Sequence, residues 1–188
     1  MESASGIFFE QYGNISREGV QEIQSKLKLN KVKKGALLLS YGQICKEIYF
    51  VKKGCLRLYH IVDGVEITVW FSFEDNSAIE LSSFLSGEPT EYFIEAIEDS
   101  EFLSLEKSEL SKLYVKHPEM ERIVRSFWED VILNLLQRLS TLQKDSAETR
   151  YLNLVNQTNY LQRIPQKYLA SYLGVTPTSL SRIRRKLK

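Results

Sequence analysis

The pattern of apolar and polar positions changes twice along the chain. Over residues 16–29 apolar residues recur at helical spacing behind Ser16, which predicts a short amphipathic helix. From residue 31 to 105 they gather instead in short runs rich in Ile, Val, Tyr and Phe, and helical spacing returns after residue 106. This order predicts an α+β chain, with an N-terminal antiparallel β-roll of the jelly-roll kind, flanking helices and an all-α C-terminal part.

The strand runs are bounded by glycines and by one Asp-Gly pair. Asp63-Gly64 separates two apolar runs and predicts a two-residue β-hairpin. The six predicted strands lie in residues 36–40, 47–54, 55–62, 65–73, 91–97 and 101–105.

One long helix is predicted after the β-rich part. A short helix over 108–116 is interrupted at His117-Pro118, because a residue before proline is pushed out of helical geometry. Apolar residues then recur at spacings of three and four, with Trp128, Ile132 and Leu136 on a flanking strip. One strip can cover the β domain, and the other would face a second copy of the chain. The alternative is a helix buried wholly against its own domain. The residues assigned to the dimer helix are Ile123, Val124, Phe127, Val131, Leu135, Leu139 and Leu142.

A hinge is predicted near residues 144–146. Asp145 and Glu148 have the spacing of a capping box, which places a helix from Ser146 to about Asn156, and a polar stretch over 157–163 follows. The expected domains are a β-roll domain over 1–116, the long helix and hinge over 117–145, and a helical domain over 146–188.

The segment from Ile164 to Lys188 has the spacing of a helix-turn-helix. Leu169, Leu173, Val175, Leu180 and Ile183 occupy its packing positions, and the small Ala170 falls where the helices cross. Gly174 stands where the first helix needs a left-handed residue, and Thr176-Pro177 provides a helix start. An ordinary amphipathic hairpin would need none of these last three features, so DNA binding is favoured.

The surface left over is polar and basic. Residues 146–188 carry eight Lys or Arg and one Glu, a net charge of +7, whereas the whole chain is +1 and its first 145 residues are therefore −6. A basic segment of this kind binds DNA phosphates through counterion release. The predicted DNA-binding residues are Lys167, Thr176, Pro177, Thr178, Ser179, Arg182, Arg185 and Lys186.

Several other classes are disfavoured. The first residues lack the basic and apolar regions of a secretory signal, and no apolar run reaches the roughly 18 residues of a membrane span, so a cytoplasmic protein is expected. Cys45 and Cys55 suit reduced core residues, and no ligand set for a metal or cofactor is apparent. No catalytic constellation appears either, so we expect no enzyme.

The order of β domain, long helix and helix-turn-helix resembles the Crp/Fnr superfamily of bacterial transcription regulators. The resemblance is carried by LASYLGVTPTSLSRIRRKL at the end of the chain and by AIELSSFLSGEPTEYFIEAIEDSEFLSL, which is similar to the family's phosphate-binding cassette. It implies a homodimer on a palindromic double-stranded DNA site, with RNA polymerase as a further partner. The chain ends directly after the second helix, so we expect no β-hairpin wing.

The resemblance also limits the effector. Glu80 matches the glutamate that contacts ribose in cyclic-AMP-binding members, but the Arg-Ser pair that holds the phosphate falls on Thr90 and Glu91. A buried phosphate needs a cation or amide donors, so cyclic AMP is disfavoured and the effector is unknown or absent. Glu80 could instead cap a short helix over 82–85. The candidate effector pocket comprises Glu80, Leu81, Thr90 and Glu91.

The same comparison singles out one residue for base reading. Arg182 matches the family's shared arginine and can contact guanine O6 and N7, whereas Pro177 has no side-chain donor to offer. The alternative function is a β-roll ligand-binding or protein-interaction module that binds nucleic acid without sequence choice.

Overall fold

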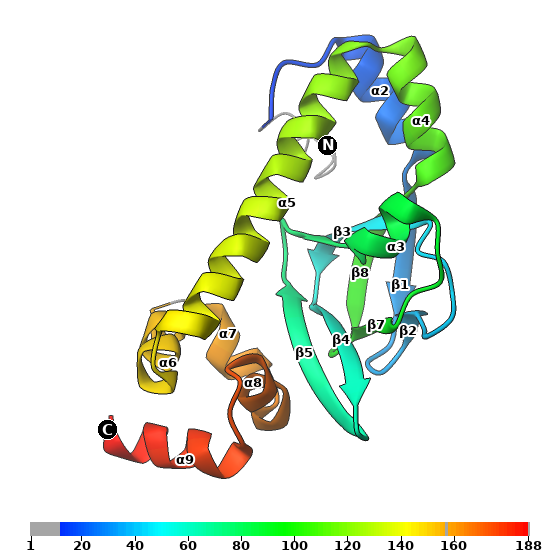
Figure 1. The fold of residues 1–188 in the computed structure, drawn as a ribbon. Coiled ribbons are helices and arrows are strands. Elements are labelled where there is room, and N and C mark those ends of the chain that lie inside the picture. The colour runs from blue at the N-terminus through cyan, green and yellow to red at the C-terminus, as the bar shows by residue number, and fades with distance from the viewer. Residues whose placement is uncertain (1–11, 157, 188) are drawn as a thin grey trace. The chain divides into compact units, whose positions relative to one another are not determined.

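The computed structural model describes residues 12–156 and 158–187 (Figure 1). Contacts between Cα atoms divide the chain into two units, Met1–Leu58 with Phe71–Asp130 and Tyr59–Trp70 with Val131–Lys188. The division passes through a β-hairpin, whose tip belongs to the second unit. The three-part division expected from the sequence stays a prediction. Gln157 and Lys188, in the predicted polar stretch and basic tail, lie outside the described residues.

Two four-stranded sheets form the β-roll. One has the strand order β1-β8-β3-β6 and the other the order β2-β7-β4-β5. The registered pairs are antiparallel, as β3 with β8 from Glu47↔Glu106 to Lys53↔Glu101. The strands are β1 (Lys28–Val32), β2 (Leu37–Leu39), β3 (Glu47–Lys53), β4 (Leu56–Val62), β5 (Val65–Ser72), β6 (Ser77–Ala78), β7 (Tyr92–Ala96) and β8 (Ser100–Glu106).

The six predicted strands are present, and two further ones were missed. β1 begins inside the range predicted as helix, because α2 (Arg17–Lys26) already ends at Leu27 in extended geometry. β6 has only two residues, too few to show an alternating pattern. The hairpin between β4 and β5 is confirmed: Asp63 and Gly64 have φ of 50° and 77°, the left-handed geometry of a two-residue turn.

Helices α4 and α5 follow the β-roll. α4 (Lys107–Lys116) ends at His117, and α5 (Glu119–Lys144) begins after Pro118, so the predicted break is confirmed. The first turns of α5 bury Met120, Ile123, Val124 and Phe127 within their own unit, each at 1% exposure or less. The ring of Phe127 lies 4.7 Å from that of Trp128, which in turn contacts Phe84. The fold is therefore the α+β fold expected from the sequence.

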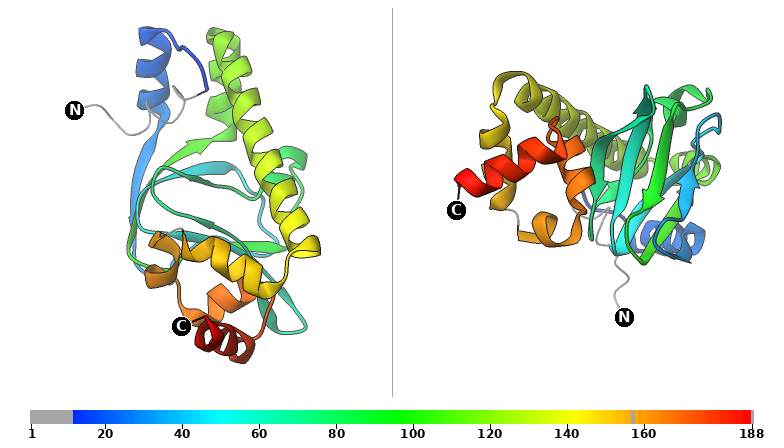
Figure 2. Two further views of the ribbon diagram at one scale, coloured as in Figure 1. Left: turned by 90° about the vertical axis from the view of Figure 1, so that its left-hand side faces the viewer. Right: turned by 90° about the horizontal axis from the view of Figure 1, so that it is seen from below.

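The rest of the chain is helical. α6 (Ala147–Val155), α7 (Thr158–Arg163), α8 (Gln166–Tyr172) and α9 (Pro177–Lys186) follow the hinge, and Figure 2 shows α9 on the outside of this group. One local prediction was wrong and one helix was missed. Ser146, rather than Asp145, is the N-cap of α6, because its Oγ accepts from the amide of Thr149. The polar stretch, for which the sequence predicted no element, contains α7.

Within the described ranges, no helix is long and apolar enough to cross a membrane. The same residues contain no cluster of three or more His, Cys, Asp or Glu side chains that could hold a metal ion.

Candidate DNA-binding surface and sensor cassette

The turn between α8 and α9 has the geometry that the sequence predicts. Leu169, Ala170 and Leu180 are fully buried, so a larger side chain at position 170 would have no room. Gly174 has φ of +68°, and the amide of Val175 donates to the carbonyl oxygen of Ala170 at 3.0 Å. The Thr176 hydroxyl caps α9 by accepting from the amide of Ser179 at 3.1 Å. These contacts fix the direction in which α9 leaves the turn.

A glutamine that the sequence analysis did not single out joins the two helices. Nε2 of Gln166 donates to Oγ of Ser181 at 2.7 Å and to the carbonyl oxygen of Pro177 at 3.3 Å. Gln166 opens α8, whereas both acceptors belong to α9. A polar residue at an exposed first helical position gives no signal of a contact made eleven and fifteen residues later.

Two arginines hold the C-terminal end of α8. Arg138 of α5 donates to the carbonyl oxygen of Tyr172 and lies 3.7 Å from the centre of its ring. Arg150 of α6 donates through Nε and Nη2 to the carbonyl oxygen of Leu173, at 3.0 and 2.8 Å. Cations favour the negative end of a helix dipole. Burial lowers the pKa of Arg138 and raises that of Tyr172. The helix that braces α9 is thus anchored to the end of α5.

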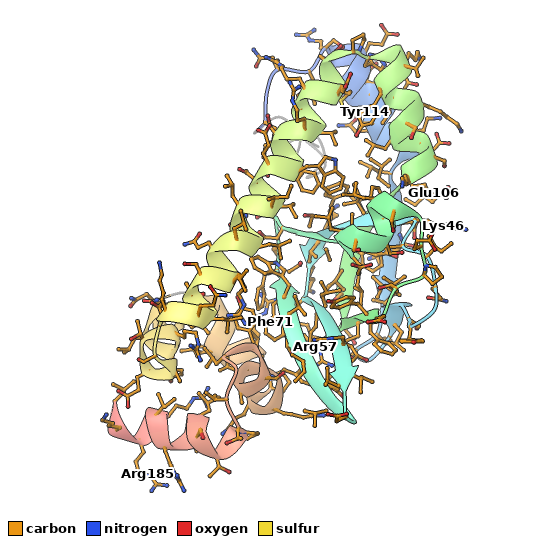
Figure 3. All side chains as sticks on the ribbon, viewed as in Figure 1. Lys46, Arg57, Phe71, Glu106, Tyr114 and Arg185 are labelled. Atoms are coloured by element: carbon orange, nitrogen blue, oxygen red, sulfur yellow. The ribbon has the colours of Figure 1, made fainter. Side chains whose placement is uncertain are left out.

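The outer face of α9 is open. Thr178, Arg182 and Arg185 are exposed, and Figure 3 shows the Arg185 side chain pointing away from the helices. Within residues 12–156 and 158–187, neither guanidinium has an ion-pair or hydrogen-bond partner. An exposed guanidinium without a partner is available for a phosphate or a base edge.

The other predicted DNA-binding residues are less free. Lys186 pairs with Glu148 at 2.8 Å, and Lys167 lies 3.3 Å from Oε1 of Glu66. Thr176 and Ser179 bond to one another while capping α9, and Pro177 is its first residue. The eight residues therefore divide into an open group on α9 and a group with partners in the chain.

The cassette in the β-roll is closed by its own residues. Glu80 is 5% exposed, and its carboxylate accepts from the amides of Ser82 at 3.1 Å and Ser83 at 2.9 Å. Glu80 is thus the N-cap of α3 (Leu81–Ser86). The sequence offered this role as the alternative to a contact with ribose. An anion binding at this helix end would have to displace the carboxylate.

The far end of α3 is also occupied. Lys107 donates through Nζ to the carbonyl oxygens of Phe84 and Leu85, the latter at 3.2 Å. The hydroxyl of Ser83 accepts from the amide of Cys45 at 3.0 Å and donates to the carbonyl oxygen of Glu88 at 2.5 Å. Side chains of the protein therefore bond to both ends of α3.

The other candidate pocket residues do not form a set with Glu80. Thr90 is buried, and its hydroxyl accepts from the amide of Tyr92 at 3.0 Å. Glu91 is exposed and Leu81 half-buried. The positions where relatives would carry an Arg-Ser pair therefore offer an internally bonded hydroxyl and an exposed carboxylate.

The predicted dimer helix is split between two environments. Ile123, Val124 and Phe127 are buried in their own unit, and Val131 and Leu135 are half-buried. Leu139 and Leu142 are exposed, as are Ile132 and Leu136 of the flanking strip and Leu133, which the sequence did not assign to either strip. This exposed apolar strip consists of Ile132, Leu133, Leu136 and Leu139, which are 46%, 61%, 56% and 52% exposed.

Comparisons with known proteins agree with this architecture. Residues 29–117 match the family model of the cyclic nucleotide-binding domain. FixK2 from Bradyrhizobium japonicum has a TM-score of 0.73 at 18% identity, covering 86% of this chain and 84% of that one. The c-di-GMP-responsive global regulator CLP from Xanthomonas campestris has a TM-score of 0.72 at 13% identity, covering 92% and 91%. A crp/fnr-family protein from Eubacterium rectale, described as a putative transcriptional regulator, has a TM-score of 0.73 at 18% identity, covering 96% and 87%.

A curated relative matches about half of this chain. Patatin-like phospholipase domain-containing protein 6 from Pongo abelii is 26% identical over 99 residues, which are 52% of this chain and 7% of that protein. So small a share of that protein transfers no activity to this chain. Residues 29–117 thus match the cyclic nucleotide-binding domain family, in a chain whose fold is similar to that of FixK2 and of the crp/fnr-family protein.

Proposed function

We propose that the chain is a cytoplasmic, homodimeric regulator of transcription that binds a palindromic DNA site and catalyses no reaction. The observation that carries the proposal is the outer face of α9, where Thr178, Arg182 and Arg185 are exposed on a helix fixed by a well-formed turn. A recognition helix enters the major groove with such a face. The regulators of the same fold support the assignment, and contact with RNA polymerase stays a prediction.

The exposed apolar strip supports the dimer. Four large side chains lie on one side of α5, each at least 46% exposed, and leaving such a strip in water is unfavourable. A second copy of α5 would cover it and place two recognition helices about one DNA turn apart. The dimer contact therefore centres on Ile132, Leu133, Leu136 and Leu139 rather than on the buried residues at the start of α5.

The sensor cassette supports an effector other than cyclic AMP, or none. Glu80 already occupies the amide donors at the start of α3, and Thr90 brings no cation. A cyclic phosphate would meet a carboxylate where it needs positive charge.

Selection of bound fragments from random DNA tests the function. We expect an enriched motif with two-fold symmetry and half-sites about one helical turn apart. Fragments bound without any enriched motif would favour the alternative, a β-roll interaction module with non-specific affinity for nucleic acid.

The oligomeric state tests the dimer separately. Leu136→Glu should yield monomers by light scattering, because it places a charge in the apolar contact. Asn134→Glu introduces the same charge on the opposite side of α5 and should leave the dimer intact. A dimer unaffected by either change would rule out the exposed apolar strip as the contact.

A further inference from the structure

The tip of the β4–β5 hairpin is bonded to the first helix of the helix-turn-helix. Oγ of Ser171 on α8 accepts from the amide of Thr68 at 2.8 Å and donates to the carbonyl oxygen of Glu66 at 2.9 Å. β5 is the edge strand of its sheet, and residues two apart on a strand direct their backbone groups to the same side. One hydroxyl therefore occupies two neighbouring groups on a strand edge that has no further strand beside it.

An ion pair lies one helical turn away. Nζ of Lys167 is 3.3 Å from Oε1 of Glu66, and Lys167 precedes Ser171 by four residues on the same face of α8. The two side chains are 67% and 28% exposed, so the pair contributes little to stability. Its effect is on charge, since it neutralises a lysine of the predicted DNA-binding set.

Glu66 and Thr68 of the hairpin and Lys167 and Ser171 of α8 join a part of the β-roll to the helix-turn-helix. β4 and β5 run from the β-roll, yet their tip, Tyr59–Trp70, groups with the helix-turn-helix. Thr68 is 3% exposed, so its bond to Ser171 lies away from water. We propose that Glu66, Thr68, Lys167 and Ser171 form a clasp that holds the helix-turn-helix in a state of low DNA affinity and opens when DNA binds.

Two physical effects of the clasp lower the affinity for DNA. The clasp keeps a carboxylate beside a lysine that phosphates would otherwise contact, and that carboxylate repels DNA. It also ties α8 to a strand edge, so any movement of α8 needed to seat α9 has to break both hydrogen bonds of Ser171. The inference rests on the proposed DNA-binding function.

Ser171→Ala tests the clasp without changing charge. Removing the hydroxyl should raise the affinity for the selected DNA site about fivefold, since the unbound protein no longer has these bonds to lose. The amide of Thr68 should also exchange faster with deuterium in the free variant. In the unaltered chain, the same amide should become more exposed to exchange when DNA is added.

Glu66→Gln tests the ionic part, with Asp63→Asn as its matched control. Both remove one negative charge from the hairpin, but Asp63 lies in the turn and outside the clasp. Glu66→Gln should raise affinity and steepen its salt dependence by about one counterion, because Lys167 becomes available to a phosphate. Asp63→Asn should have a markedly smaller effect.

The outcomes separate this inference from the proposed function. If Ser171→Ala binds the site no better than the unaltered chain, or more weakly, the clasp does not restrain DNA binding. Equal effects of Glu66→Gln and Asp63→Asn would reduce the ionic part to general electrostatics and overturn it. If neither the unaltered chain nor any variant binds DNA, the proposed function fails and the clasp fails with it.

Discussion

The α3 cassette and the outer face of α9 treat their polar groups in opposite ways. Around α3, Glu80 and Lys107 close the two ends of the helix. On α9, Arg182 and Arg185 extend from the helix and bond to nothing in the described part of the chain. The polar groups around α3 are bonded within the fold, whereas the guanidinium groups on α9 are exposed to solvent.

A polar group that is bonded within the fold is unavailable to a ligand, whereas an exposed polar group remains available. A buried polar group must be bonded, so a cassette that lacks its ligand's partners is stable only if the chain supplies substitutes. An exposed cation carries no such requirement, because water solvates it. Exposed polar groups on α9 are therefore better evidence for a binding site here than the match of residues 29–117 to a ligand-binding domain family.

The open face should show the largest effect. Arg182→Ala should weaken specific binding by about 1 to 3 kcal/mol and relax one base preference, because a bidentate contact with guanine is lost. Competition gel shifts with specific and random DNA measure this. Arg125→Ala, an equal charge change at an exposed position of α5, is the control. Equal losses for Arg182→Ala on both DNAs would refute a base-reading role.

The closed cassette should respond in stability instead. Glu80→Ala removes the cap of α3 and should lower the free energy of unfolding by about 0.5 to 2 kcal/mol while DNA affinity stays unchanged. Glu91→Ala removes an exposed carboxylate nearby and should cost less than about 0.5 kcal/mol. Denaturant melts of both variants give the comparison, which fails if the two lose the same stability.

Substitution of Lys186 should affect DNA binding less than substitution of Arg182 and more than substitution of Glu80. Its ammonium is exposed but pairs with Glu148, so Lys186→Ala should weaken binding to all DNA sequences alike by less than about 1 kcal/mol. The slope of log affinity against log salt should fall by at most about one unit. A base-selective loss would instead place Lys186 among the readers of sequence.

Cyclic AMP should have the smallest effect. Because Glu80 occupies the helix amides and no arginine stands at position 90, the nucleotide should leave the melting temperature unchanged. A melting curve recorded with a large excess of cyclic AMP checks this. A strong upward shift would mean that the cassette can exchange its internal bonds for a ligand.

The helix-turn-helix was the part most completely predictable from sequence. Ala170, Gly174 and Thr176-Pro177 act through local geometry, and each has the burial, φ or cap that its residue type predicts. The predicted strands and the Asp63-Gly64 turn were found for the same reason. β6 and α7 were not, because their segments are short and lack a clear apolar period.

The chain's sequence by itself determined the α+β order of elements, the break at Pro118 and the presence of Thr90 where cyclic-AMP-binding Crp/Fnr proteins are expected to carry an arginine. Tertiary structure alone decided which apolar strip of α5 is left exposed, that Glu80 is used as a cap, and that Ser171 and Lys167 meet the β4–β5 hairpin. The reason is physical: periodicity, turns and caps arise between residues a few positions apart. A contact between residues about a hundred positions apart depends on how whole elements pack.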